Sequence, residues 1–87
     1  MTEVILDGQE MVNREATHKY IKDKLSLPSY YGENLDALWD MIVTYDRDIQ
    51  IRLINKEALA ENLGQYGKDI IGIFMEASRE NNNIRCL

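Results

Sequence analysis

The chain has 87 residues, of which 45% are hydrophobic and 29% are charged, so it can bury one core and predicts a single domain over residues 1–87. No apolar run approaches the roughly 18 residues of a membrane span, and the N-terminal residues lack the basic and apolar regions of a signal peptide, so we expect a cytoplasmic protein. The net charge of −5 disfavours direct binding to nucleic-acid phosphates, and it suits either a cationic partner or simple solubility.

The first third of the chain predicts one strand and one helix. Residues 4–6 form a short apolar run that stops at the turn pair Asp7-Gly8, which is typical of a strand buried on both faces. Asn13 can cap a helix that ends before Pro28. One face of this helix carries the side chains that we expect in the core: His18, Ile21 and Leu25.

The middle of the chain predicts a loop, a second helix and a second strand. Residues 29–33 form the loop, and Asn34 is a good cap for a helix that runs to about Val43. The helical spacing predicts a core-facing stripe of Leu35, Leu38 and Ile42. Apolar and polar residues alternate over residues 49–54, which indicates a strand with one partly exposed face, as at the edge of a sheet.

The last third predicts two helices and a short strand. Asn55 can cap a short helix through Leu63, and Gly64 suits its end because glycine accepts the left-handed conformation at low cost. A longer helix is expected over residues 68–81, followed by an apolar strand over residues 84–87. The core stripe of the longer helix is expected to be Ile70, Ile73, Phe74 and Ala77.

The order of these elements predicts the fold class. Three strands separated by helices within 87 residues indicate an α/β fold with a parallel sheet, since parallel strands need long crossover connections. Those crossovers should be right-handed. No internal repeat, linker or low-complexity segment interrupts the pattern.

The residues that catalysis requires are not arranged for it in this sequence. The only histidine, His18, lies on an apolar helix face, where packing explains it better than chemistry. No serine stands in a nucleophile elbow, no glycine-rich loop precedes a phosphate-binding lysine, and Cys86 has no second cysteine to pair with. We therefore predict a protein that is not an enzyme and needs no cofactor. A metal-dependent enzyme that uses Asp36, Asp40 and Glu76 is the alternative that the sequence supports least.

The second helix carries an unusual acidic face. Asp36 and Asp40 stand four residues apart, so they share one face and repel each other. Asp36 is explained by the helix dipole, which favours acids in the first turn, whereas Asp40 lies in the C-terminal half, where the dipole disfavours it. Aromatic residues flank this face at Tyr30, Trp39 and Tyr45. Such a pattern is typical of a protein interface, although a solvated helix face has the same composition.

The segment LPSYYGENLDALWD, residues 27–40, resembles the signature of the barstar family of intracellular ribonuclease inhibitors. The similarity continues less closely over residues 18–25 and over residues 73–77 with Glu80. The resemblance implies a small two-layer fold in which helices cover a three-stranded parallel sheet of order 1-2-3. It also implies inhibition, by a monomer that binds one-to-one and blocks the active site of a basic, barnase-like ribonuclease.

The resemblance further implies roles for particular residues. Asp40 would occupy the place of a substrate phosphate, Asp36 would pair with a basic group at the wall of the cleft, and Tyr30 would pack against the catalytic histidine. The other residues that would contact or attract the partner are Gly32, Asn34, Leu35, Trp39, Thr44, Tyr45, Glu76 and Glu80.

The sequence departs from the barstar pattern just after the acidic helix. Val43-Thr44-Tyr45 stands where the family carries a small polar residue, a glycine and a tryptophan, and Arg47 adds a positive charge nearby. An immunity or regulatory protein of the same fold, directed at a different basic toxin, is therefore the alternative to ribonuclease inhibition.

Overall fold

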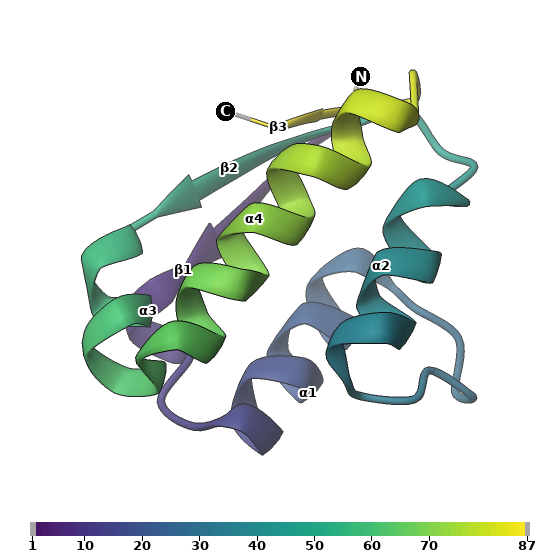
Figure 1. The fold of residues 1–87 in the computed structure, drawn as a ribbon. Coiled ribbons are helices and arrows are strands. Elements are labelled where there is room, and N and C mark those ends of the chain that lie inside the picture. Colours follow the sequence, from purple (N-terminus) through teal and green to yellow (C-terminus); the bar gives the residue numbers. More distant parts are fainter. Residues whose placement is uncertain (1, 87) are drawn as a thin grey trace.

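The computed structural model describes residues 2–86, which form three strands, four α-helices and one short 3₁₀ turn (Figure 1). In chain order these are β1 (Thr2–Asp7), η1 (Gly8–Glu10), α1 (Arg14–Leu25), α2 (Leu35–Val43), β2 (Ile49–Ile54), α3 (Lys56–Leu63), α4 (Gln65–Glu80) and β3 (Ile84–Cys86). The three strands and four helices predicted from the sequence are confirmed. The expected end of the last strand, Leu87, lies outside the described residues.

The strands form one parallel sheet in the order β1-β2-β3, which confirms the expected α/β class and strand order. Val4 pairs with Ile51, and Ile49 pairs with Ile84. Because β2 lies in the centre, the expectation of an edge strand at residues 49–54 was wrong. The alternation reflects one exposed face of the sheet, and an exposed face does not require an edge position.

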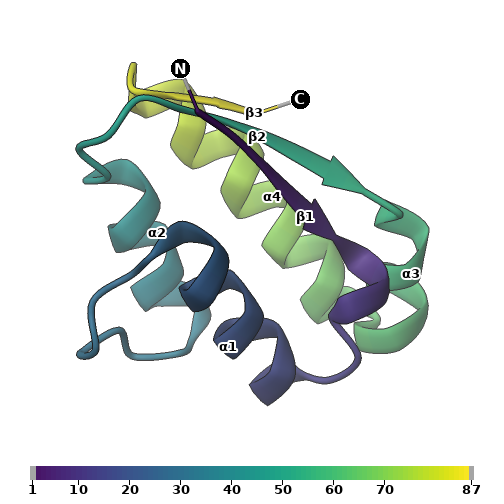
Figure 2. The same cartoon turned by 180° about the vertical axis from the view of Figure 1, so that it is seen from behind.

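Only one face of the sheet is covered. Leu6 is fully buried, whereas its neighbour Ile5 is 42% exposed, so the expectation that residues 4–6 are buried on both faces was wrong. On the open face Arg52 donates to a carboxylate oxygen of Glu3 at 3.2 Å, joining β2 to β1. The helices gather on the other side, with α1 against β1 and α4 against β3, in the expected two layers (Figures 1 and 2).

Asparagine side chains cap the N-terminal ends of α1 and α2. The side chain of Asn13 accepts from the amide of Ala16 at 2.8 Å, and that of Asn34 accepts from Ala37 at 2.8 Å, so both predicted caps are confirmed. Asn55 makes no such cap, because its side chain donates instead to Asp7 at 2.8 Å. That hydrogen bond lowers the pKa of the Asp7 carboxyl.

Helix α4 starts three residues earlier than expected. It begins at Gln65, directly after Gly64, whose φ of 61° is a conformation that glycine adopts at low cost. The earlier start places Tyr66 inside the helix. The predicted core stripe of α4 is fully buried at Ile70, Phe74 and Ala77, whereas Ile73 is only partly buried.

Candidate protein-binding site

Helix α2 separates a core side from an acidic side, as predicted. Leu38 and Ile42 are fully buried, and Leu35 is half-buried. Asp36 and Asp40 are both exposed. The 3.6-residue period of the helix accounts for this division, since residues four apart lie above one another on the same side.

The carboxylates of Asp36 and Asp40 form no ion pair or hydrogen bond with any side chain in residues 2–86. The backbone carbonyl of Asp40 accepts from the amide and the hydroxyl of Thr44 at 3.2 and 2.6 Å. Thr44 thus closes the C-terminal end of α2. Two like charges on one helix face repel each other, so this surface is ready to accept cations from another molecule.

Helix α4 contributes the remaining acidic residues of the predicted site. It packs against α2 (Figure 1), and Glu76 and Glu80 are exposed on it, one turn apart. Glu76 forms an exposed ion pair with Arg79 at 3.2 Å, which partly neutralises it. Glu80 makes no ion pair within the described residues.

The loop from residue 26 to residue 34 presents one aromatic side chain and buries the next. Tyr30 is 79% exposed, which makes it the most exposed of the large hydrophobic side chains between residues 2 and 86. Gly32 and Asn34 are also exposed, whereas Tyr31 is 4% exposed. Trp39 on the adjacent helix is half-buried, so part of its ring is available for contact.

Tyr45 does not flank the acidic face as an open aromatic. It is only 9% exposed, and its hydroxyl donates to the carbonyl of Leu25 at 2.8 Å. Arg47 lies over the ring of Tyr45, with its guanidinium carbon 5.0 Å from the ring centre, and donates to the carbonyls of Leu25 and Ser26 at 3.3 and 3.4 Å. Both side chains therefore secure the C-terminal end of α1, where a positive charge is favourable.

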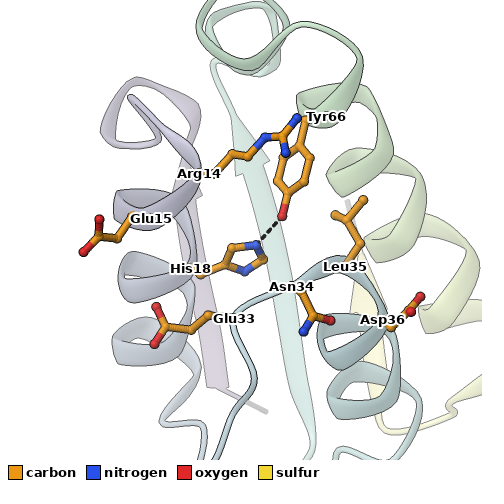
Figure 3. A pocket seen from close by; sticks show the side chains of 8 residues that line it. All are labelled: Arg14, Glu15, His18, Glu33, Asn34, Leu35, Asp36 and Tyr66. Carbon is orange, nitrogen blue, oxygen red and sulfur yellow. Dashed lines mark hydrogen bonds between the residues drawn. The ribbon is translucent and has the colours of Figure 1, made fainter.

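Two hollows border α2. The larger, of about 680 Å³, is lined by Arg14, Glu15, His18, Glu33, Asn34, Leu35, Asp36 and Tyr66 (Figure 3). In this view Leu35 points toward Tyr66, and Asp36 points away from it. The smaller, of about 200 Å³, is lined by Ser26, Leu27, Pro28, Tyr30, Met41, Thr44, Tyr45, Asp46 and Arg47. The predicted contact residues thus border two separate concavities as well as the ridge of α2.

His18 lies in the core, as its place on the apolar face of α1 predicts. It is 1% exposed; its Nδ1 lies 2.6 Å from the hydroxyl of Tyr31, and its Nε2 lies 2.7 Å from the hydroxyl of Tyr66. Burial lowers the pKa of His18 and raises the pKa values of both tyrosines. The sequence pattern does not reveal this three-residue group, because it predicts the start of α4 after Tyr66 and gives no separate signal at Tyr31.

The lowered pKa of His18 makes stability depend on pH. The unfolded chain binds a proton at His18 near pH 6.5, whereas the folded chain binds it only at lower pH. The contribution of His18 to the free energy of unfolding should therefore be constant above about pH 7.5 and fall as the pH drops through 6.5, by at most about 1.4 kcal/mol per pH unit. Urea unfolding at pH 7, 6 and 5 measures this change. A His18→Gln variant should lose the dependence, and an unchanged slope in that variant would contradict the assignment.

Residues 2–86 contain no group of three or more His, Cys, Asp or Glu side chains placed to hold a metal ion. Asp36, Asp40 and Glu76 therefore do not form the metal centre that the enzymatic alternative required. Among the same residues, no helix is long and apolar enough to cross a membrane.

Comparison with known proteins supports the relationship that the acidic helix suggested. The family model described as "Barstar (barnase inhibitor)" matches residues 1–86. A protein of Bacillus subtilis (strain 168), named "Putative ribonuclease inhibitor YrdF", is 41% identical over 81 residues, which cover 92% of this chain and 89% of that protein. This match over nearly the whole length shows that the chain belongs to the barstar family, whose members are inhibitors and not enzymes.

Proposed function

We propose that this protein inhibits a basic, barnase-like ribonuclease by binding it one-to-one and covering its active site with the acidic face of α2. The observation that carries this proposal is the pair of exposed carboxylates, Asp36 and Asp40, which no cationic side chain in residues 2–86 neutralises. An active site that binds RNA phosphates must present cations, and carboxylates on a rigid helix offer the complementary charge.

The position of Asp40 favours a role outside the fold. It lies in the last turn of α2, close to the carbonyl ends of the helix dipole, and its carboxylate receives no hydrogen bond within the described residues. Local stability therefore gives no reason for an acid here. A cationic cleft in the partner does, because the carboxylate can take the place of a substrate phosphate.

Uncharged residues around the acidic face would supply contact area. Tyr30 is largely exposed and Trp39 is half-buried, and aromatic side chains of this kind dominate the binding energy of many interfaces. In this proposal Gly32, Asn34 and Leu35 make the close contacts beside them. Thr44 borders the smaller hollow at the rim, and Tyr45 contributes only the small exposed part of its ring.

The acids of α4 would act mainly at longer range. Glu80 carries an unpaired exposed charge within residues 2–86, and Glu76 shares its charge with Arg79. Charges at the rim of an interface change the rate of association more than the final affinity. We therefore assign steering of the basic partner to these two residues.

The proposed role also implies where the protein works. We propose that it acts as a monomer in the bacterial cytoplasm, where it protects the cell that produces the ribonuclease. The relative from Bacillus subtilis supports a bacterial setting. An immunity protein for a different basic toxin would use the same charge complementarity.

Assays with purified barnase test the proposal. One equivalent of this protein should abolish RNA cleavage, and the association rate should fall steeply as salt rises from about 50 to 500 mM, because salt screens the attraction between opposite charges. Stopped-flow fluorescence measures the association rate, and a cleavage assay measures the stoichiometry. Inhibition that requires a large excess of protein, or an association rate indifferent to salt, would contradict the proposal. Absence of inhibition together with tight binding to another basic toxin would favour the alternative.

A further inference from the structure

The loop between α1 and α2 carries three of the proposed contact residues without any regular secondary structure. The amide of Leu27 donates back to the carbonyl of Lys22 in α1 at 2.9 Å, and within the loop the amide of Tyr31 donates to the carbonyl of Pro28 at 3.0 Å. Tyr30 projects into solvent, and the next side chain, Tyr31, turns inward and is 4% exposed. Tyr31 is therefore the side chain that anchors the tip of the loop to the rest of the molecule.

A chain of polar contacts runs from that anchor to the last helix. The hydroxyl of Tyr31 meets one ring nitrogen of His18 on α1, and the other ring nitrogen meets the hydroxyl of Tyr66 on α4, at 2.6 and 2.7 Å. The guanidinium carbon of Arg14 lies 4.1 Å from the centre of the Tyr66 ring. Figure 3 shows Arg14, Tyr66 and His18 in this arrangement. The loop, α1 and α4 are thus joined through one imidazole.

Packing alone does not explain these polar groups. Phenylalanine would fill nearly the same volume without burying hydroxyls, whereas a buried hydroxyl or imidazole costs free energy unless every polar atom is bonded. No buried side-chain nitrogen or oxygen in the described residues lacks a partner. A fully bonded buried network makes its surroundings rigid and permits few alternative arrangements. The chain of contacts is therefore suited to fixing one geometry of the loop.

We infer that Tyr66 is a positioning residue for the partner-binding loop: through His18 and Tyr31, its hydroxyl holds the loop in the conformation that presents Tyr30 and Asn34. This inference rests on the proposed function, because it assumes that the loop contacts the ribonuclease. Tyr66 itself needs no contact with the partner. A neutral imidazole donates from one nitrogen and accepts at the other, so loss of the Tyr66 hydroxyl leaves one nitrogen of His18 without its protein partner.

A Tyr66→Phe variant tests the inference, because it removes the hydroxyl and keeps the ring beneath Arg14. If the loop then adopts its binding conformation about one tenth of the time, the apparent Kd for barnase rises about tenfold. Titration calorimetry measures this affinity. Amide hydrogen exchange at residues 30–34 of the free variant should become faster, and this measurement needs no partner.

Tyr20→Phe is the matched control. Tyr20 is also a half-buried tyrosine, and its hydroxyl accepts a single hydrogen bond, from the amide of Asp7 at 2.9 Å. That bond secures β1, so its loss should lower the urea midpoint without changing the affinity for barnase or the exchange of the loop. A double variant with Tyr31→Phe and Tyr66→Phe should bind no more weakly than Tyr31→Phe alone, because both changes break the same chain of contacts.

The outcomes separate this inference from the proposed function. The positioning role would be overturned if amide hydrogen exchange at residues 30–34 were as slow in Tyr66→Phe as in the unaltered protein. It would also be overturned if Tyr66→Phe lost no more affinity than Tyr20→Phe. If the unaltered protein fails to bind barnase, the proposed function is wrong, while faster loop exchange in Tyr66→Phe would still show that Tyr66 holds the loop.

Discussion

An Asp40→Ala variant should bind barnase at least about 30-fold more weakly than the unaltered protein. Removing one member of a desolvated charge pair at a protein interface costs about 2–5 kcal/mol. The complex of barnase with barstar is itself one of the cases from which this range is known. The free energy of unfolding should not fall, because the Asp40 carboxylate pairs with no side chain in residues 2–86 and opposes the helix dipole. Titration calorimetry and urea unfolding measure the two quantities separately.

Asp23→Ala provides the matched control for Asp40. Asp23 is an exposed aspartate in the last turn of α1, so it has the same charge and a similarly poor position relative to its helix dipole. It lies outside the proposed interface. Its removal should change the affinity by no more than about threefold, because it alters only the long-range electrostatic potential of the protein. Equal losses of affinity in the two variants would mean that total charge, not the α2 face, attracts the partner.

A Gly67→Ala variant should be clearly less stable than the unaltered protein, although alanine is the better helix former. Gly67 lies where α4 crosses α3, and an added Cβ would stand 2.7 Å from the carbonyl carbon of Leu59, a backbone atom that cannot move without displacing α3. Overpacking costs about 1–3 kcal/mol, and a clash with backbone atoms belongs at the upper end of that range, so it outweighs the gain of about 1 kcal/mol from the higher helix propensity of alanine. We expect a net loss of about 2 kcal/mol, or a decrease in Tm of about 10 °C.

Gly72→Ala makes the same chemical change on the same helix without the clash. Apart from its chain neighbours and the backbone of α4 itself, no atom lies within 4 Å of the Cβ that would be added there. This variant should therefore gain about 0.5–1 kcal/mol of stability, because alanine favours the helix and restricts the unfolded chain. Thermal unfolding of both variants by circular dichroism provides the comparison. If Gly67→Ala is as stable as Gly72→Ala, the close approach of α3 and α4 is not as the structure describes it.

Local spacing in the sequence determined the helices and the division of α2. Asparagine caps at Asn13 and Asn34, and apolar residues at helical spacing, were sufficient to place α1 and α2, because these signals act within one or two turns of the chain. The same spacing separated the buried Leu38 from the exposed Asp40. The family resemblance over residues 27–40 added the strand order, which the structure confirms. The roles of the acidic residues in binding stay predictions.

Only the tertiary structure decided which polar and aromatic side chains are engaged inside the molecule. Tyr45 bonds to the carbonyl of Leu25, Asn55 turns to Asp7 instead of capping α3, and Tyr66 reaches His18, across separations of 20, 48 and 48 residues. The open face of the sheet, where Ile5 is exposed, likewise depends on helices far along the chain that all pack on one side. The spacing of residues along a helix shows only which residues close in sequence share a face. The local sequence therefore determined the acidic face of α2, whereas packing between distant segments determined which residues hold the neighbouring loop in place.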